Sequence, residues 1–124
     1  MFDRMADDPT VRDADCLFCK IVAGEIAADL VHRGDRVLAF RDINPQAPLH
    51  VLVIPLAHHH SVGALAAAEP AALEELVVTA ERIAADEGHD AYRLVFNTGA
   101  RAGQSVFHVH GHVLAGRDMR WPPG

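Results

Sequence analysis

The sequence lacks the features typical of membrane-spanning, disulfide-stabilised and nucleic-acid-binding proteins. Two cysteines in 124 residues are too few for a disulfide framework. There is a single lysine and no run of basic residues, and 17 acidic against 11 basic residues give a net charge of −6, which argues against binding a nucleic-acid backbone. The longest apolar stretches, residues 51–57 and 64–68, fall far short of the ~18 residues that span a bilayer. We therefore expect a cytoplasmic protein with no membrane and no nucleic-acid partner.

What the sequence does contain fits one compact domain. Half of its residues are hydrophobic, and a chain of this length buries roughly two-thirds of its unfolded surface. The first 14 residues are rich in aspartate and include Pro9, and they lack the apolar segment of a signal peptide. We expect residues 1–14 to form a disordered or loosely attached leader and residues 15–124 to form the domain.

Hydrophobic periodicity predicts several short strands and one main helix. Strands are expected at residues 30–33 and 37–40, joined as a hairpin, and at 50–54, 91–97 and 106–115. A short helix is expected over residues 15–22, capped by Asp15 and ended by Gly24, and Ser61 is expected to cap a helical turn. The main helix is expected over residues 70–87, before Gly88, with an apolar stripe formed by Leu73, Leu76, Val77, Ala80, Ile83 and Ala84. Without regular βαβ alternation, this pattern predicts an α+β fold with an antiparallel sheet.

The most informative segment is the strand expected near the C-terminus, where histidines alternate with apolar residues. Alternate side chains of a strand share a face, so His108, His110 and His112 should project to one side and Phe107, Val109 and Val113 to the other. A single histidine on a strand is ordinarily a structural residue, but a solvated face would mix residue types rather than repeat one titratable ring. The pattern indicates an anionic ligand, a metal or a covalent nucleophile.

This block resembles the histidine-triad (HIT) family, whose motif is His-x-His-x-His followed by apolar residues, and in particular its Hint branch of nucleotide-binding phosphoramidases. Four further segments are similar to that branch, so that the resemblance spans residues 15–124. They are Cys16-Leu17-Phe18-Cys19-Lys20-Ile21-Val22-Ala23-Gly24-Glu25-Ile26, Phe40-Arg41-Asp42-Ile43-Asn44-Pro45-Gln46-Ala47-Pro48, Gly103-Gln104-Ser105-Val106 and Trp121-Pro122-Pro123-Gly124.

The resemblance implies a HIT-like fold and a hydrolase. The fold has a five-stranded antiparallel sheet with one main helix and a short N-terminal helix, and two such sheets join across a homodimer. The reaction converts adenosine or guanosine 5′-phosphoramidates to the nucleoside monophosphate and an amine, without an organic cofactor. His110 is then the nucleophile that becomes nucleotidylated, His112 binds phosphate oxygens and Ser105 assists departure of the amine. Asn97 and Gln104 lie near the phosphate and ribose.

The resemblance also implies how the nucleoside is held. Asp42 accepts hydrogen bonds from the ribose diol, and an apolar slot holds the base. The slot residues are Leu17, Phe18, Ile21, Phe40 and Ile43. Several of these side chains are of types that would, taken alone, be ordinary core residues.

A structural zinc site is a further implication. Family members with a Cys-x-x-Cys pair near the N-terminus complete a tetrahedral site with two histidines, which correspond here to His50 and His108, beside Cys16 and Cys19. His108 would then be a scaffold residue rather than a catalyst, and the alternative is a pair of free buried thiols. The neighbouring run of His58, His59 and His60 is expected to be a solvated turn.

Two departures from the Hint pattern stand out. Leu56-Ala57 occupy positions where the branch often carries lysines. Gly111 occupies a position that is usually bulky and apolar, and it suggests a close backbone approach on the back face.

Other functions remain open at this point. The sister branch hydrolyses dinucleoside polyphosphates, although the Trp121-containing tail favours Hint and is expected to reach the partner's active site in a homodimer. A metal-dependent hydrolase with three histidine ligands is disfavoured, because alternate strand positions lie about 6.6 Å apart. A nucleotide-binding interaction module with incidental activity is the third alternative.

Overall fold

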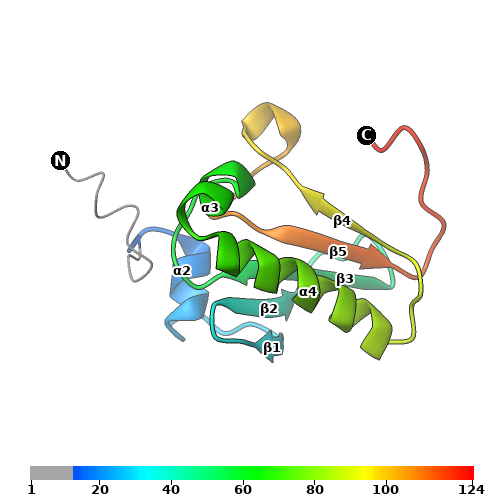
Figure 1. Cartoon of the computed structure of the whole chain (residues 1–124), viewed down its shortest axis with the longest axis horizontal. Helices are drawn as coiled ribbons and strands as arrows, with labels where there is room; N and C mark the ends of the chain where they lie inside the picture. Colours follow the sequence, from blue (N-terminus) through cyan, green and yellow to red (C-terminus); the bar gives the residue numbers. More distant parts are fainter. Residues whose placement is uncertain (1–12) are drawn as a thin grey trace.

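The computed structural model of the chain describes residues 13–124, and the predicted leader, residues 1–14, lies almost wholly outside them. In chain order the elements are α2 (Leu17–Val22), β1 (Leu30–Arg33), β2 (Val37–Arg41), β3 (Leu49–Pro55), α3 (Val62–Ala68), α4 (Pro70–Asp86), β4 (Tyr92–Phe96), the 3-10 turn η1 (Ala100–Ala102) and β5 (Gly111–Ala115) (Figure 1). None of the helices in this described part is long and apolar enough to cross a membrane.

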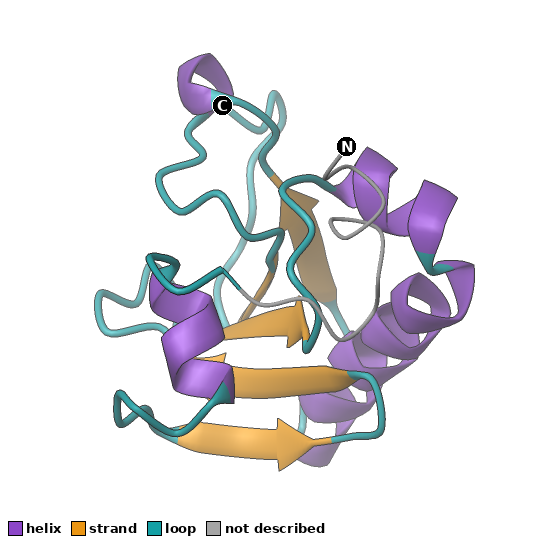
Figure 2. Ribbon diagram, turned by 90° about the vertical axis from the view of Figure 1, so that its left-hand side faces the viewer, coloured by secondary structure: helices purple, strands orange, loops and turns teal. Residues whose placement is uncertain are grey.

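The strands form one antiparallel sheet in the order β1-β2-β3-β5-β4, so that β1 and β4 are its edges. Figure 2 shows the long helix α4 on one side of the sheet and the short helix α2 on the other. The expected α+β fold, with five antiparallel strands, one main helix and a short N-terminal helix, is confirmed.

Strand β3 is buried along its whole length and feeds two cores. Val51 and Val53 belong to the core that packs beneath α4, together with Leu76. Leu52 and Ile54 point to the opposite face and belong to the core beneath α2. Because successive strand residues alternate between these faces, the even-numbered side chains of β3 all project from the face of the sheet on which α2 lies.

Helix α4 begins with Pro70 in its first turn and ends before Gly88, whose φ of +86° suits glycine. The predicted stripe is correct for Leu76, Ala80, Ile83 and Ala84, which are buried, and needs one correction. Val77 is 41% exposed, and Ala72 and Thr79 are buried instead. The face of α4 that packs on the sheet is therefore rotated slightly from the face predicted from the apolar residues alone.

The short helices differ in how well their caps were predicted. Ser61 caps α3 as expected, with its hydroxyl accepting a hydrogen bond from the Ala64 backbone N–H at 3.2 Å. At α2 the cap is Cys16 rather than Asp15: the Cys16 Sγ accepts from the Cys19 backbone N–H at 3.3 Å, and Asp15 is exposed.

The predicted strand over residues 106–115 is a strand only from Gly111 to Ala115. His108 and His110 lie in the irregular segment that precedes β5. The two-sided pattern survives there, because Val109 packs in the core beneath α4. Phe107 departs from it: its side chain is 50% exposed and is not part of the apolar back face.

Candidate active site and metal centre

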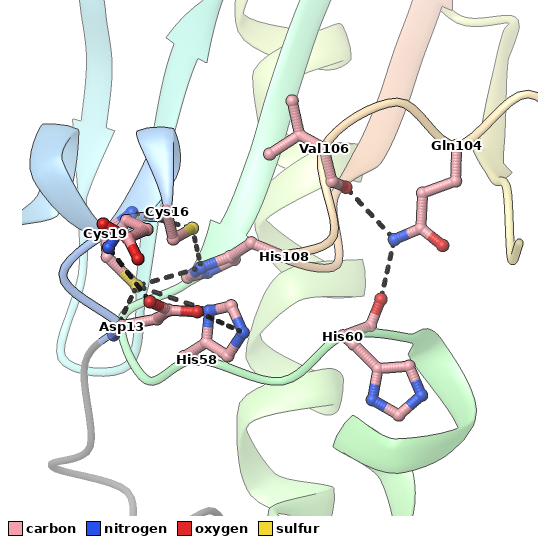
Figure 3. Close-up of polar contacts among 9 residues, drawn as sticks. Asp13, Cys16, Cys19, His58, His60, Gln104, Val106 and His108 are labelled. Atoms are coloured by element: carbon pink, nitrogen blue, oxygen red, sulfur yellow. Dashed lines mark hydrogen bonds and ion pairs between the residues drawn. The ribbon is translucent and has the colours of Figure 1, made fainter. Parts of the chain in front are cut away.

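The segment that carries the histidines is held by backbone contacts to the loop before α3. The Val109 N–H donates to the His59 carbonyl at 2.7 Å. The Gln104 side-chain amide donates to the carbonyls of His60 at 2.7 Å and Val106 at 3.1 Å (Figure 3). Its carbonyl oxygen accepts from the Gly99 N–H at 2.9 Å. Both the NH₂ group and the oxygen of the buried Gln104 amide are therefore hydrogen-bonded to backbone groups, which fixes the segment before the histidines against the loop before α3.

His110 is held as a neutral imidazole with one free nitrogen. Its Nδ1 donates to the backbone carbonyl of His108 at 2.9 Å, which leaves the lone pair of the neutral ring on Nε2. The Phe18 ring stands edge-on to it, with centroids 5.1 Å apart. Burial lowers the pKa of His110, against smaller opposing effects of the His108 carbonyl and Asp42. This geometry is that of a nitrogen nucleophile that needs no external base.

His112 lies beside His110, with ring centroids 4.9 Å apart, and contacts a second histidine from β3. The His50 Nε2 is 2.9 Å from the His112 Nδ1 and 3.5 Å from Asp42 Oδ2. Burial, reinforced by the neighbouring His110 and His50, lowers the pKa of His112 to about 4. The ring is therefore neutral at physiological pH.

The ligand atoms of Asp42, His50 and His112 lie within 4.8 Å of one another, as in a metal site, but the chemistry of His50 argues against one. The Gln46 backbone N–H donates to His50 Nδ1 at 3.0 Å. Nδ1 must then be the accepting nitrogen, so the neutral ring carries its proton on the Nε2 that faces Asp42 and His112. A protonated nitrogen cannot bind a cation, so we assign no metal to Asp42, His50 and His112.

A second cluster brings together two thiols and two imidazoles: Cys16, Cys19, His58 and His108, whose donor atoms lie within 4.8 Å of one another. His108 Nδ1 lies 3.4 Å from Cys16 Sγ and 3.5 Å from Cys19 Sγ, and His58 Nδ1 lies 3.4 Å from Cys19 Sγ (Figure 3). His108 Nε2 donates to the Pro55 carbonyl at 2.9 Å, which leaves Nδ1 as the ligating nitrogen. Two sulfurs and two nitrogens that converge in this way suit tetrahedral zinc.

The predicted metal set needs one correction, because His50 is not part of this cluster and His58 takes its place. His50 lies near the start of β3, where it contacts His112, whereas His58 follows the end of that strand, next to α2. The solvated turn expected for residues 58–60 is also wrong for two of its members. His58 joins the cluster, and His59 is buried with its Nε2 2.7 Å from Glu69 Oε2. Only His60 exposes its ring.

The residues expected to form the base slot occupy different surroundings. Phe18 and Phe40 are buried in the core beneath α2, in edge-to-face contact at 5.4 Å. Ile21 lines a hollow of about 340 Å³ with Ile26 and Leu30, two residues that the sequence analysis did not select. Ile43 is fully exposed.

The remaining predicted residues lie at the surface or at its edge. Ser105 and Leu17 line a separate hollow of about 320 Å³, together with Phe107 and His58. Asn97 is half-buried next to Gly103, within 3.6 Å of the position of a Cβ there. Trp121 is 83% exposed in the C-terminal segment after β5 (Figure 1), although the neighbouring Arg120 carbonyl accepts a hydrogen bond from Arg93 on β4 at 2.9 Å.

Comparisons with known proteins place the chain in a family. The model of a family described as the HIT domain matches residues 23–119 of the chain. A Zea mays protein named "14 kDa zinc-binding protein" is 46% identical over 125 residues, covering 98% of this chain and 92% of its own length. An Arabidopsis thaliana protein named "Adenylylsulfatase HINT1" is 42% identical over 119 residues, covering 93% and 80%. The crystal structure of a HIT family hydrolase from Legionella pneumophila superposes with a TM-score of 0.85 at 46% identity, covering 89% of this chain and all of that one.

Proposed function

Because the chain belongs to the HIT domain family, we propose that it is a hydrolase that cleaves purine nucleoside 5′-phosphoramidates, those of adenosine or guanosine, to the nucleoside monophosphate and an amine. The observation that carries the proposal is the state of His110. Its Nδ1 proton is committed to the His108 carbonyl, and burial keeps the ring neutral, so that Nε2 is a ready nucleophile.

The reaction proceeds in two displacements at phosphorus. In the first, His110 Nε2 attacks the α-phosphorus, a bond from phosphorus to His110 forms, and the bond from phosphorus to the amine nitrogen breaks. The departing amine takes a proton, for which the Ser105 hydroxyl is the donor we assign. Water then attacks the phosphorus and gives a proton to the Ser105 oxygen, the bond to His110 breaks, and the monophosphate leaves. His112 stabilises the charge that builds on the phosphoryl oxygens in both steps.

The nucleoside is assigned to the side of the sheet that faces α2. Asp42 is half-buried, which leaves its carboxylate accessible to a ligand, and its Oδ2 lies 3.5 Å from His50 Nε2. A carboxylate at this place suits two adjacent ribose hydroxyls. The apolar hollow beside Ile21 is of a size to take a purine ring, and Ile21 packs against the core that contains Phe18 and Phe40.

Zinc is the metal we assign to Cys16, Cys19, His58 and His108. The name of the Zea mays relative supports this assignment, as does the convergence of two thiols and two imidazoles. When bound, zinc would contribute folding energy and hold α2 against the histidine segment. His108 thereby serves as a scaffold residue whose carbonyl orients His110.

We further propose that the chain acts as a homodimer in the cytoplasm. Strand β4 is an edge strand, paired with β5 on one side only, and Trp121 is 83% exposed in the described part of the chain. A second copy would cover both, and the tail would border the partner's leaving-group site. Sedimentation at micromolar concentration should show a dimer. Deleting residues 119–124 should leave that dimer largely intact and change the relative rates among leaving-group amines; a monomer, or unchanged relative rates, would contradict the assignment.

The decisive experiment compares turnover of a fluorogenic adenosine phosphoramidate with that of a diadenosine polyphosphate and of adenylyl sulfate. The last substrate is included because of the name of the Arabidopsis relative. We expect the phosphoramidate to be preferred and His110→Ala to reduce its turnover by at least about a thousandfold, equal to roughly 4 kcal/mol of barrier. His32→Ala, on β1, is the matched control and should leave turnover intact. Preference for the polyphosphate would favour the sister activity, and binding of nucleotide without turnover would favour an interaction module.

A further inference from the structure

We propose that His50 is a positioning residue whose single ring proton is shared between Asp42 and His112, so that a ribose bound to Asp42 directs that proton to His112. His112 is then fixed as the tautomer that offers an N–H to the phosphate. This inference rests on the proposed function of the same site and adds to it a route by which ribose recognition prepares the catalytic group.

The first step is that His50 has only one proton to give. The Gln46 backbone N–H is a donor only and lies 3.0 Å from His50 Nδ1, so the proton of the neutral ring must sit on Nε2. The turn holds Gln46 in this place, because the Asp42 N–H bonds the His50 carbonyl at 3.0 Å and Arg117 Nε bonds the Gln46 carbonyl at 2.9 Å. The His50 side chain is 4% exposed, so water scarcely competes for its proton.

The second step is that two acceptors lie near this proton, His112 within hydrogen-bond distance and Asp42 within ion-pair distance. His112 Nδ1 is 2.9 Å from His50 Nε2, and Asp42 Oδ2 is 3.5 Å from the same atom. The other carboxylate oxygen, Oδ1, already accepts from the Asn44 N–H at 2.8 Å. Hydroxyl groups that donate to Asp42 would draw on its negative charge and weaken its hold on the His50 proton. The proton then goes fully to the nearer acceptor, His112.

The third step concerns the far side of the His112 ring. The ring is neutral, because burial and its histidine neighbours lower its pKa to about 4. A neutral ring that accepts at Nδ1 carries its own proton on Nε2. An Nε2–H donates to a phosphoryl oxygen, whereas the opposite tautomer would present a lone pair and repel it. The His50 contact therefore decides whether His112 helps or hinders the transition state.

Two substitutions at His50 separate positioning from packing. Glutamine keeps an amide donor near the place of Nε2 and an acceptor for Gln46, whereas leucine keeps bulk and removes both. We expect His50→Leu to lower kcat by about 10- to 10,000-fold, the span of losses seen when a group that orients a histidine is removed, with KM changed little. His50→Gln should restore most of kcat. Equal losses in the two variants, or an effect confined to KM or to thermal stability, would overturn the proposal.

Nitrogen chemical shifts of ¹⁵N-labelled histidine report the His112 tautomer directly. Adenosine 5′-monophosphate should shift wild-type His112 toward the Nε2–H form, and its 2′,3′-dideoxy analogue should bind without doing so. The same shift with both nucleotides would overturn the link through Asp42. If neither nucleotide binds, the proposed function fails. The ligand-free protein still tests the role of His50, because His50→Leu must change the tautomer of His112. An unchanged His112 tautomer in that variant would refute the positioning role.

Discussion

His110 donates its Nδ1 proton to the backbone carbonyl of His108 at 2.9 Å, while the His108 ring turns away to face the two cysteines. One residue thus belongs to both halves of the site. Its backbone orients His110, the nucleophile we propose, and its side chain anchors the segment to α2. Stability of the thiol and imidazole cluster is therefore linked to the orientation of His110, although the cluster itself touches no reacting atom.

This linkage predicts which histidine is needed for metal. Protein purified without a histidine tag should hold about one zinc per chain, because the four donor atoms of the cluster converge on one point. The Cys16→Ser/Cys19→Ser double variant and His58→Gln should lose the metal together with thermal stability, as measured by metal analysis and melting. His50→Gln is the matched control and should retain zinc, since His50 bonds His112 instead. If the wild-type protein holds no metal and the variants are as stable as it is, the alternative of two buried thiols without metal would be favoured instead.

The pH dependence of catalysis should follow from the lowered pKa values of the two working histidines. Burial lowers the pKa of His110 below 6.5 and that of His112 to about 4. Protonation removes the nucleophilic lone pair, and burial in the folded protein opposes it, so the acid limb of the rate should be centred below pH 6.5. A profile of kcat/KM, corrected for spontaneous hydrolysis and checked for folding at each pH, tests this. An acid limb centred at or above 6.5 would contradict it.

The sequence predicts the sheet, α4 and the grouping of the catalytic histidines because each depends on local periodicity. It does not tell His50 from His58 as a ligand, since His50 lies near the start of β3, His58 follows its end, and either could meet the cysteines. The seven-residue strand separates its two ends by about 20 Å at ~3.3 Å per residue. Which end lies beside α2 depends on how the sheet is ordered in space. The Gln46 contact to His50 was missed for another reason: a backbone N–H leaves no signal in the residue types.

The ribose role of Asp42 predicts a substrate-dependent loss. Asp42→Ala should raise KM far more for ribonucleotide than for 2′-deoxyribonucleotide substrates, because only the former present a diol, and an unmade hydrogen-bonded pair costs roughly 1–3 kcal/mol. Because Asp42 also competes for the His50 proton, kcat should be largely retained. Steady-state kinetics with matched ribo- and deoxyribo-phosphoramidates measure both parameters. Equal changes in KM for the two sugars would remove Asp42 from the ribose role.

Gly111 is explained by the side chains that fill the place of its own. A Cβ there would lie 3.0 Å from Leu94 Cδ1 and 3.1 Å from two ring carbons of Phe96, which sits opposite it on β4. These side chains pack against the core beneath α4, so a bulky residue would overfill it. Gly111→Val should therefore lower the free energy of unfolding by about 1–3 kcal/mol, the usual cost of overpacking.

The compensating change is Phe96→Ala, which vacates the space that valine would enter. Measured by urea unfolding, the double variant Gly111→Val/Phe96→Ala should be more stable than the sum of the single effects by about 1 kcal/mol or more, as for residues in direct contact. Val78→Ala, an exposed position on α4, is the control and should combine additively with Gly111→Val. Because Gly111 immediately follows His110, the proposed nucleophile, the single valine variant should also slow turnover. If the double variant regains activity together with stability, packing behind the site sets the position of His110. Strict additivity of the two core changes would mean that Phe96 does not occupy the place of the missing side chain.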